Sequence, residues 1–263
     1  MYDLAAIQSE LATTIFAGKL HFTRTTQSTN SDGLAAARSG APHGSVYFAD
    51  EQTAGRGRGD HAWHSAAGEG LYVSVLLRPE VPIASLPLLP LAAGLTAAEA
   101  IRAVSGVEID LRWPNDLLIG PRKTGGILVE ARNDSERLLH AAVVVGIGIN
   151  VHQRSFPPDL ATPATSLDIA AGCRISRQQL LIALLKSLQQ EVLALKEIDL
   201  ATKIPARVEQ SSTWARGRRV AVHGPQACTG VTAGLDEHGF LRVETAEGIV
   251  TVQTGGLRDE DRS

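Results

Sequence analysis

The chain has 263 residues, of which 44% are hydrophobic and 20% are charged, and its formal net charge is −3. This balance is typical of a globular protein and excludes the disordered and fibrous classes. Basic and acidic residues are interspersed, with no polybasic segment of the kind that binds nucleic acid or lipid headgroups. We therefore expect small molecules and other proteins as partners, and neither nucleic acid nor a membrane.

The cysteines and the N-terminal segment indicate the compartment. Cys173 and Cys228 are far apart and have no CxxC or CxxH companion, so neither a disulfide framework nor a zinc site is expected. The N-terminal residues lack the basic start and continuous apolar stretch of a signal peptide. The sequence has no uninterrupted run of about 18 apolar residues, so no membrane-spanning helix is expected. These features predict a cytoplasmic protein in a reducing environment.

Hydrophobic periodicity and turn residues predict both helices and strands in the larger part of the chain. Helices are expected at residues 3–16, 31–39, 88–104 and 176–195. Strands are expected at residues 46–50, 71–77, 108–111, 126–131 and 138–149. The last two strands flank a polar turn at 132–137 and should form an antiparallel hairpin. The prediction is an α+β fold with a mixed or antiparallel sheet and flanking helices.

The sequence pattern changes in the last part of the chain. From Arg219 onward, short alternating segments such as RVAVHG and FLRVET are separated by turns that contain glycine. This pattern is typical of a small β-barrel or sandwich of about 50 residues. Because chains beyond about 250 residues tend to split, we predict two domains, at residues 1–212 and 213–263.

The glycine-rich segment GRGRG, Gly55–Gly59, is the most unusual motif. Its glycines permit close backbone approach, and Arg56 and Arg58 supply forked donors for phosphate or carboxylate, so the segment could clamp an anion. It fits neither the dinucleotide fingerprint nor the P-loop pattern. A flexible surface turn with two solvated arginines is the alternative, and from this motif alone both interpretations stay open.

Two further motifs carry charged residues beside turns or glycines. In RWPND, Pro114 restricts the backbone and holds Asn115 and Asp116 in a defined turn after a strand. In KTGGIL, Lys123 precedes a glycine pair that opens a buried strand, so its charge could lie over a ligand placed against the glycines. Alone, the first motif would be read as a simple turn and the lysine as a solvated loop residue.

Other motifs exclude common chemistries. GIGIN at Gly146–Asn150 imitates half of a nucleotide fingerprint, but Val151 stands where the third glycine is needed. His61 and His64 form an HxxH without a third ligand, so no metal site is expected. The hydrolase motifs GxSxG and HExxH do not occur.

Taken together and in order, these segments resemble the biotin protein ligases over nearly the whole chain. The resemblance is carried by STN at Ser28–Asn30, Gln52, GRGR at Gly55–Arg58, Trp63, RWPND at Arg112–Asp116, KTGGIL at Lys123–Leu128 and GIGIN at Gly146–Asn150. It implies a catalytic core related to that of class II aminoacyl-tRNA synthetases, followed by an SH3-like β domain. It also implies the monofunctional type, without an N-terminal DNA-binding domain.

The resemblance implies that biotin and ATP form biotinyl-5′-AMP, with Mg²⁺ bridging the phosphates, and that biotin then passes to a lysine of a biotin carboxyl carrier protein of acetyl-CoA carboxylase. The implied catalytic residues are Lys123, Arg56 and Asp116, the last orienting the carrier lysine or accepting its proton. The implied biotin-binding residues are Ser28, Thr29, Asn30, Gln52, Arg56, Gly57, Arg58, Lys123, Gly125 and Gly126. The implied ATP-binding and adenylate-binding residues are Arg56, Arg58, Trp63, Asn115, Lys123 and Asn150. No residue is expected to bind a metal directly, and a homodimer is left open.

The chain departs from the family pattern at three positions. Asp60 and His61 stand where glycine and arginine are usual, so closure of the glycine-rich segment is expected to be weaker or pH-sensitive. Arg112 stands where lysine is common, which keeps the positive charge.

Three other functions are less consistent with the sequence. A lipoate or octanoate ligase runs the same chemistry, but lipoate has no ureido group for STN and Gln52 to bind. A transcriptional repressor would need a DNA-reading module, for which the roughly 20 residues before the first catalytic strand are too few. A non-catalytic scaffold is disfavoured by the intact Lys123, Arg56 and Arg58.

Overall fold

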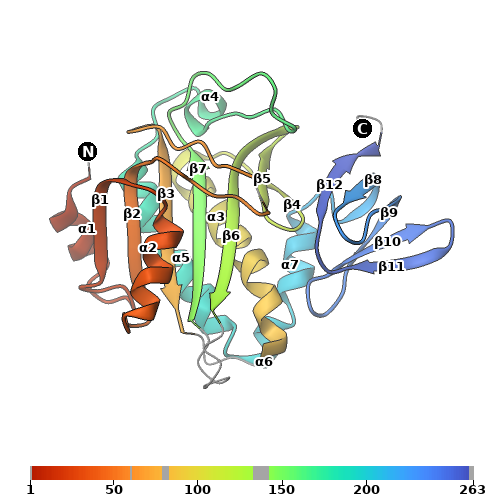
Figure 1. Ribbon diagram of the computed structural model, residues 1–263, viewed down its shortest axis with the longest axis horizontal. Coiled ribbons are helices and arrows are strands. Elements are labelled where there is room, and N and C mark those ends of the chain that lie inside the picture. Colours follow the sequence, from red (N-terminus) through yellow and green to blue (C-terminus); the bar gives the residue numbers. More distant parts are fainter. Residues whose placement is uncertain (1, 60, 79–82, 133–141, 261–263) are drawn as a thin grey trace.

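The computed structural model describes residues 2–59, 61–78, 83–132 and 142–260. Its centre is a seven-stranded sheet in the order β1-β2-β3-β7-β6-β5-β4 (Figure 1). Only β1 and β2 pair in parallel, and the other neighbours are antiparallel, so the predicted mixed sheet is confirmed. The strands are β1 Leu20–Thr26, β2 Ser45–Gln52, β3 Gly70–Leu77, β4 Asp110–Arg112, β5 Asp116–Ile119, β6 Arg122–Arg132 and β7 Ala142–Asn150.

The expected hairpin is formed by β6 and β7, which pair antiparallel with Gly126 opposite Gly148. Strand β6 begins at Arg122, four residues before the predicted start, so Lys123 lies in the strand and not in a loop. Asp116 likewise opens strand β5, which the sequence analysis did not expect. The predicted turn at 132–137 lies outside the described residues from 133 on, as does the start of the strand expected at 138.

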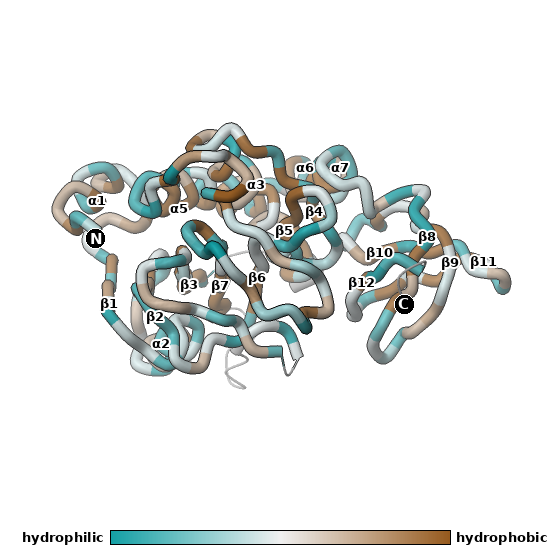
Figure 2. The backbone as a smooth tube through the Cα atoms, turned by 90° about the horizontal axis from the view of Figure 1, so that it is seen from above, coloured by the Kyte–Doolittle hydropathy of each residue, from teal (hydrophilic) through white to brown (hydrophobic). Residues whose placement is uncertain are grey.

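Helices cover both faces of the large sheet. Helices α3 and α5 pack on each other and on one face, and α2 packs on β2, β3 and β7 from the other (Figure 2). The helices are α1 Leu4–Glu10, α2 Thr29–Arg38, α3 Leu89–Ser105, α4 Leu167–Ala171, α5 Arg177–Ala194, α6 Ile198–Ala201 and α7 Ile204–Gln210, with a 3₁₀ turn η1 at Ile83–Leu88.

Two helix boundaries differ from the expectation. Helix α2 begins at Thr29 and not at residue 31, because extended Ser28 caps it and its carbonyl accepts from the Asp32 amide. Thr29 and Asn30 are therefore buried in the first turn. Helix α1 ends at Glu10 and not at residue 16, since the chain continues in turns in which the Thr14 hydroxyl bonds the Leu11 carbonyl.

The segment Ser85–Ser105 is long and apolar enough to cross a membrane by length and composition alone. This corrects the expectation that the chain has no such segment, which considered only uninterrupted apolar runs. Most of the segment is buried inside the molecule, where α3 packs on α5, β6 and β7. Its apolar character is therefore explained by its place in the core.

A second, five-stranded antiparallel sheet follows α7, in the order β11-β10-β9-β8-β12. Its fold agrees with the predicted SH3-like β domain. It docks on the large domain where the Trp113 indole donates to the Gly239 carbonyl at 3.0 Å. The Arg218 guanidinium stacks on Trp214 at the same junction, 3.7 Å from the ring centre. The strands are β8 Arg216–His223, β9 Cys228–Leu235, β10 Leu241–Thr245, β11 Gly248–Val252 and β12 Gly256–Asp259.

Candidate active site

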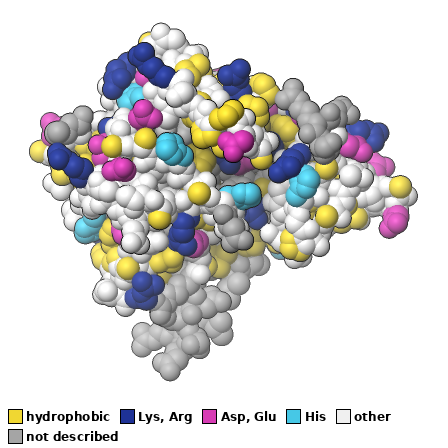
Figure 3. Space-filling model, turned by 45° about the horizontal axis from the view of Figure 1, so that its top comes forward, with side chains coloured by type: hydrophobic (Ala, Val, Ile, Leu, Met, Phe, Trp, Pro, Cys, Tyr) yellow, Lys and Arg dark blue, Asp and Glu magenta, His cyan; other side chains and the backbone are white. Residues whose placement is uncertain are grey.

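The candidate site lies where the described residues between β2 and β3, 53–59 and 61–69, cross strands β7 and β6. Bridges from Gln52 to Ser65 and from Arg56 to Ala62 fold this segment back on itself. Figure 3 views the upper end of the molecule in Figure 1, where basic and acidic side chains are interspersed and no broad patch of one sign covers the face shown. The electrostatic attraction on a ligand would therefore come from individual charged side chains near it and not from a broad charged surface.

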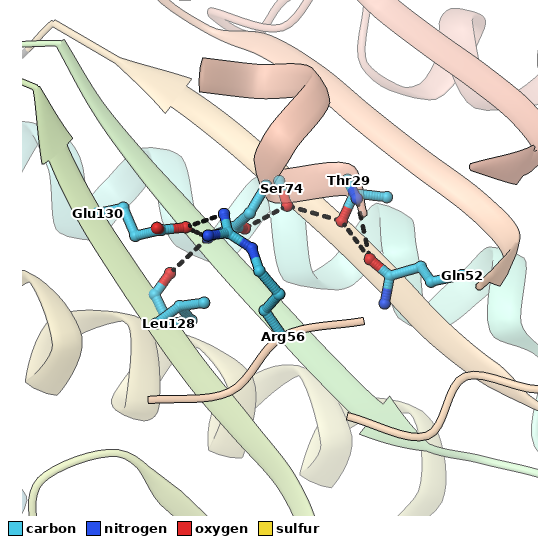
Figure 4. Close-up of polar contacts among 7 residues, drawn as sticks. Thr29, Gln52, Arg56, Ser74, Leu128 and Glu130 are labelled. Carbon is cyan, nitrogen blue, oxygen red and sulfur yellow. Dashed lines mark hydrogen bonds and ion pairs between the residues drawn. The ribbon is translucent and has the colours of Figure 1, made fainter. Parts of the chain in front are cut away.

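A chain of polar side chains runs across β2, α2 and β3 (Figure 4). The Gln52 amide nitrogen donates to the Ser65 hydroxyl at 2.8 Å, and its oxygen accepts from the Thr29 backbone amide at 2.9 Å. The Ser74 hydroxyl lies 2.7 Å from the Thr29 hydroxyl and 2.6 Å from Asn30 Oδ1. Ser74 and Thr29 are almost fully buried. These contacts therefore hold the polar side chains of Gln52, Thr29, Ser74 and Asn30 in fixed orientations.

The chain of polar groups ends on an arginine. Asn30 Nδ2 donates to Glu130 Oε2 at 2.8 Å and to the Leu128 carbonyl at 3.3 Å. The same Glu130 oxygen accepts from Arg56 Nη2 at 2.7 Å. Figure 4 shows Arg56 reaching from the glycine-rich segment toward Glu130 on β6.

Gly146 makes room for this arrangement. It lies on β7 opposite Ser74 and Leu128, and a Cβ at its position would be 2.0 Å from Asn30 Oδ1. The first residue of the GIGIN motif is therefore explained by the packing of Asn30 and not by a nucleotide fingerprint.

A cluster of three charges forms the second part of the site. Asp116 Oδ1 lies 2.5 Å from Lys123 Nζ, and its Oδ2 lies 2.6 Å from Arg112 Nη2. Burial alone would raise the pKa of Asp116, but the nearby Lys123 and Arg112 outweigh it and hold that pKa below its usual value. Asp116 is therefore ionised at neutral pH, and the Lys123 side chain is 28% exposed.

Trp63 lies on a floor made by paired glycines. A Cβ at Gly148 would be 2.6 Å from the Trp63 Nε1, and one at Gly126 would be 3.5 Å from the edge of the indole. Lys123 Nζ lies 5.5 Å from the ring centre, and the buried Nε1 has no hydrogen-bond partner among the described residues. The structure thus brings Trp63, Lys123 and the glycines of two motifs together.

Asn115 and Asn150 make contacts within the scaffold. Asn115 donates to the Ile127 carbonyl at 2.6 Å, and Asn150 donates to the Thr165 carbonyl at 3.1 Å. These bonds tie the turn of RWPND to β6 and the end of β7 to the loop before α4.

Arg58 points to the second domain. Its guanidinium donates to the Gly255 carbonyl at 2.8 Å and to the Thr254 hydroxyl at 3.0 Å. Burial lowers the pKa of Arg58, and Asp116 partly opposes this. In the glycine-rich segment itself, Gly57 donates to the His61 carbonyl at 2.7 Å, whereas the departure at position 60 lies outside the described residues. Arg58 therefore connects this segment to the turn between β11 and β12.

The remaining predicted residues lie at the same end of the sheet. Ser28 is buried as the residue that caps α2. Gly125 is needed for close packing, since a Cβ there would be 2.7 Å from the Leu117 side chain and 2.9 Å from the Gly148 carbonyl oxygen. Within the described part of the chain there is no group of three or more His, Cys, Asp or Glu that could hold a metal ion.

Sequence reasoning missed Ser74, Glu130 and Thr254. Ser74 is the one polar residue in the apolar strand LYVSVLL, and Glu130 is an acidic residue inside a strand, so both carried a signal. Thr254 carried none, because its contact depends on how the two domains dock.

Comparison with known proteins agrees with this geometry. Residues 20–150 match the model of the biotin/lipoate A/B protein ligase family. The biotin–[acetyl-CoA-carboxylase] ligase of Mycobacterium tuberculosis is 34% identical over 239 residues, which cover 88% of this chain and 85% of that protein. The chain belongs to the biotin/lipoate A/B protein ligase family.

Further relatives and a solved structure cover most of the chain. The bifunctional ligase/repressor BirA of Bacillus spizizenii is 34% identical over 258 residues, which are 95% of this chain and 77% of that protein. The biotin protein ligase of Aquifex aeolicus, solved in complex with biotin and ATP, matches with a TM-score of 0.79 and 31% identity. That match covers 92% of this chain and 98% of the Aquifex chain, so the likeness to this family member includes the second domain.

Proposed function

We propose that this protein is an ATP-dependent biotin protein ligase that forms biotinyl-5′-AMP and then transfers biotin to a lysine of a biotin carboxyl carrier protein. The observation that carries the proposal is the ordered chain of polar groups from Gln52 to Asn30, which ends on Arg56. A ureido ring has N–H donors and a carbonyl acceptor that must all be paired once buried. Oriented amide and hydroxyl groups supply such partners, and the cations beyond them suit the carboxylate end.

In the first step, a biotin carboxylate oxygen attacks the α-phosphorus of ATP and pyrophosphate leaves. Two anions meet in this step, so positive charge that is fixed in advance lowers the barrier. We assign this role to Lys123 and Arg56, with ATP entering as its magnesium complex. Trp63, Asn115 and Asn150 would bind the adenosine part.

In the second step, the neutral amine of the carrier lysine attacks the acyl carbon of the mixed anhydride, AMP leaves, and the proton released from the amine passes to water. Asp116 is the candidate for orienting this amine. Because Lys123 and Arg112 hold its pKa low, Asp116 is a weak base, and the geometry favours orientation of the amine over acceptance of its proton.

The setting of the reaction is part of the same proposal. The carrier would be the biotin carboxyl carrier protein of acetyl-CoA carboxylase, and the reaction would take place in the cytoplasm. Residues 1–212 would form the catalytic domain and residues 213–263 the SH3-like domain. Neither the formation of biotinyl-5′-AMP nor the transfer of biotin to the carrier requires nucleic acid or a membrane.

The direct test is transfer to a carrier. The purified protein is incubated with ATP, magnesium, biotin and an apo biotin carboxyl carrier domain, and the mass of the carrier is measured. We expect addition of one biotinyl group, which disappears when the target lysine of the carrier is replaced by arginine. An unmodified carrier, or equal modification with lipoate, would contradict the proposal.

A further inference from the structure

Glu130 is a carboxylate inside the candidate site for which the proposed chemistry has no role. It lies on β6 opposite Val144 of β7, so the pairing of two strands fixes its backbone. Its side chain is 26% exposed, and one oxygen, Oε2, accepts from both Asn30 and Arg56. An acceptor shared by two donors at 2.8 and 2.7 Å is held by both of them.

The hydrogen bonds of Asn30 fix the direction of this contact. Asn30 Oδ1 accepts from Ser74, and its nitrogen donates to the Leu128 carbonyl and to Glu130. If the amide were flipped, its oxygen would face two acceptors, so the orientation is determined. Glu130 Oε2 therefore accepts from Asn30 Nδ2.

Arg56 is less constrained by the fold than Glu130. It lies in a segment bounded by glycines, its side chain is 42% exposed, and among the described residues only its Nη2 makes a hydrogen bond. A long side chain in such a segment would otherwise sample many rotamers. The contact with Glu130 holds one nitrogen of the fork, and the other guanidinium donors have no partner among the described residues, so they could bind a ligand.

We infer that Glu130 is a positioning residue that holds the Arg56 side chain over the site. Through Asn30, Glu130 also connects Arg56 to the polar groups that would bind the ureido ring. This inference rests on the proposed function for its catalytic consequence, but the contact itself can be tested separately. In the reaction, Glu130 acts only through Arg56, which places positive charge on the transferring group. Loss of Glu130 should therefore lower kcat more than it raises KM.

The first test needs no activity. Trypsin cleaves after arginine, so the rate of cleavage between Arg56 and Gly57 in the ligand-free protein reports how freely Arg56 leaves its place. We expect Glu130→Gln to raise this rate about fivefold, as loss of a partly exposed ion pair implies. Cleavage between Arg216 and Gly217 in β8 should not change, which shows that the fold is intact. Glu51→Gln is the matched control, because Glu51 accepts from Thr25 at the edge of β2 and not from Arg56.

The second test is a double-mutant cycle in biotin-dependent pyrophosphate exchange. Glu130→Gln should lower kcat about tenfold and should have no further effect on the Arg56→Ala background, since both changes remove the same placed charge. Glu130→Asp, which keeps the charge but shortens the side chain, should fall between wild type and Glu130→Gln.

The two tests separate the failure of this inference from that of the proposed function. Absence of exchange in the wild type would refute the ligase proposal, while tryptic cleavage would still decide the Arg56 contact. Unchanged cleavage after Arg56 in Glu130→Gln, or losses that add in the double mutant, would overturn the inference.

Discussion

Replacing Arg58 with glycine should open the contact between the glycine-rich segment and the second domain. A mixed anhydride hydrolyses in water, so a ligase must keep its adenylate enclosed until the carrier docks. Arg58 ties the segment to Thr254 and Gly255 by two hydrogen bonds. We expect Arg58→Gly to weaken retention of the adenylate more than it slows its formation.

The magnitude follows from these contacts. Hydrogen bonds from a charged group contribute about 1.5–3 kcal/mol when buried, but Thr254 is exposed, so we assign the pair together about 1–1.5 kcal/mol. The added glycine favours the open segment by a further 0.4–1 kcal/mol, roughly. The sum of about 2 kcal/mol predicts a rise of about 30-fold in the adenylate off-rate.

The assay combines two measurements. The off-rate of biotinyl-AMP is followed after a chase with unlabelled ligand, and released adenylate is detected by biotinylation of an unrelated lysine-rich protein. Thr254→Val, which removes one acceptor, should raise the off-rate about fivefold, and Thr251→Val on exposed β11 should leave it unchanged. An unchanged off-rate without bystander labelling in Arg58→Gly would refute the idea that this segment is a lid.

Three further predictions concern the rest of the site. Lys123→Ala should slow adenylation at least about 100-fold, because it removes a charge placed for the transition state, and a near-normal rate of pyrophosphate exchange would make this lysine an ordinary surface residue. The pKa of Asp116 is lower folded than unfolded, so its stabilising effect is present above about pH 4 and is lost as pH falls through the folded pKa. The difference in unfolding free energy between wild type and Asp116→Asn should accordingly narrow in urea titrations below pH 4, roughly, and a gap that stays constant would contradict this sign. Gly146→Ala should cost about 1–3 kcal/mol in the same titrations because its Cβ would overlap Asn30, whereas Gly256→Ala, with open space around it, should cost almost nothing.

The sequence predicted the fold class because its signals are local. Short runs of apolar residues predict buried strands such as Leu71–Leu77 and the apolar helix α3. The polar residues 132–137 between two apolar runs predict that β6 and β7 pair as a hairpin. Short elements were missed, since β5 has four residues and offers too little periodicity. The start of α2 was misplaced because the alanine run begins after the true cap at Ser28.

The candidate site was predictable only in part. Motifs identified Lys123, Arg56 and Trp63, and the structure places Lys123 beside Trp63 and connects Arg56 to Glu130 further along β6. The partners that hold them depend on strand register and domain docking, which no local pattern encodes. Glu130 reaches Arg56 across 74 positions of sequence, and Thr254 reaches Arg58 across 196.

The central claim is that the site activates the carboxylate of biotin with ATP. Exchange of labelled pyrophosphate into ATP measures this step alone, without a carrier protein. We predict exchange that requires both biotin and magnesium and that lipoate does not support. Exchange that is independent of biotin, or equally fast with lipoate, would contradict the account.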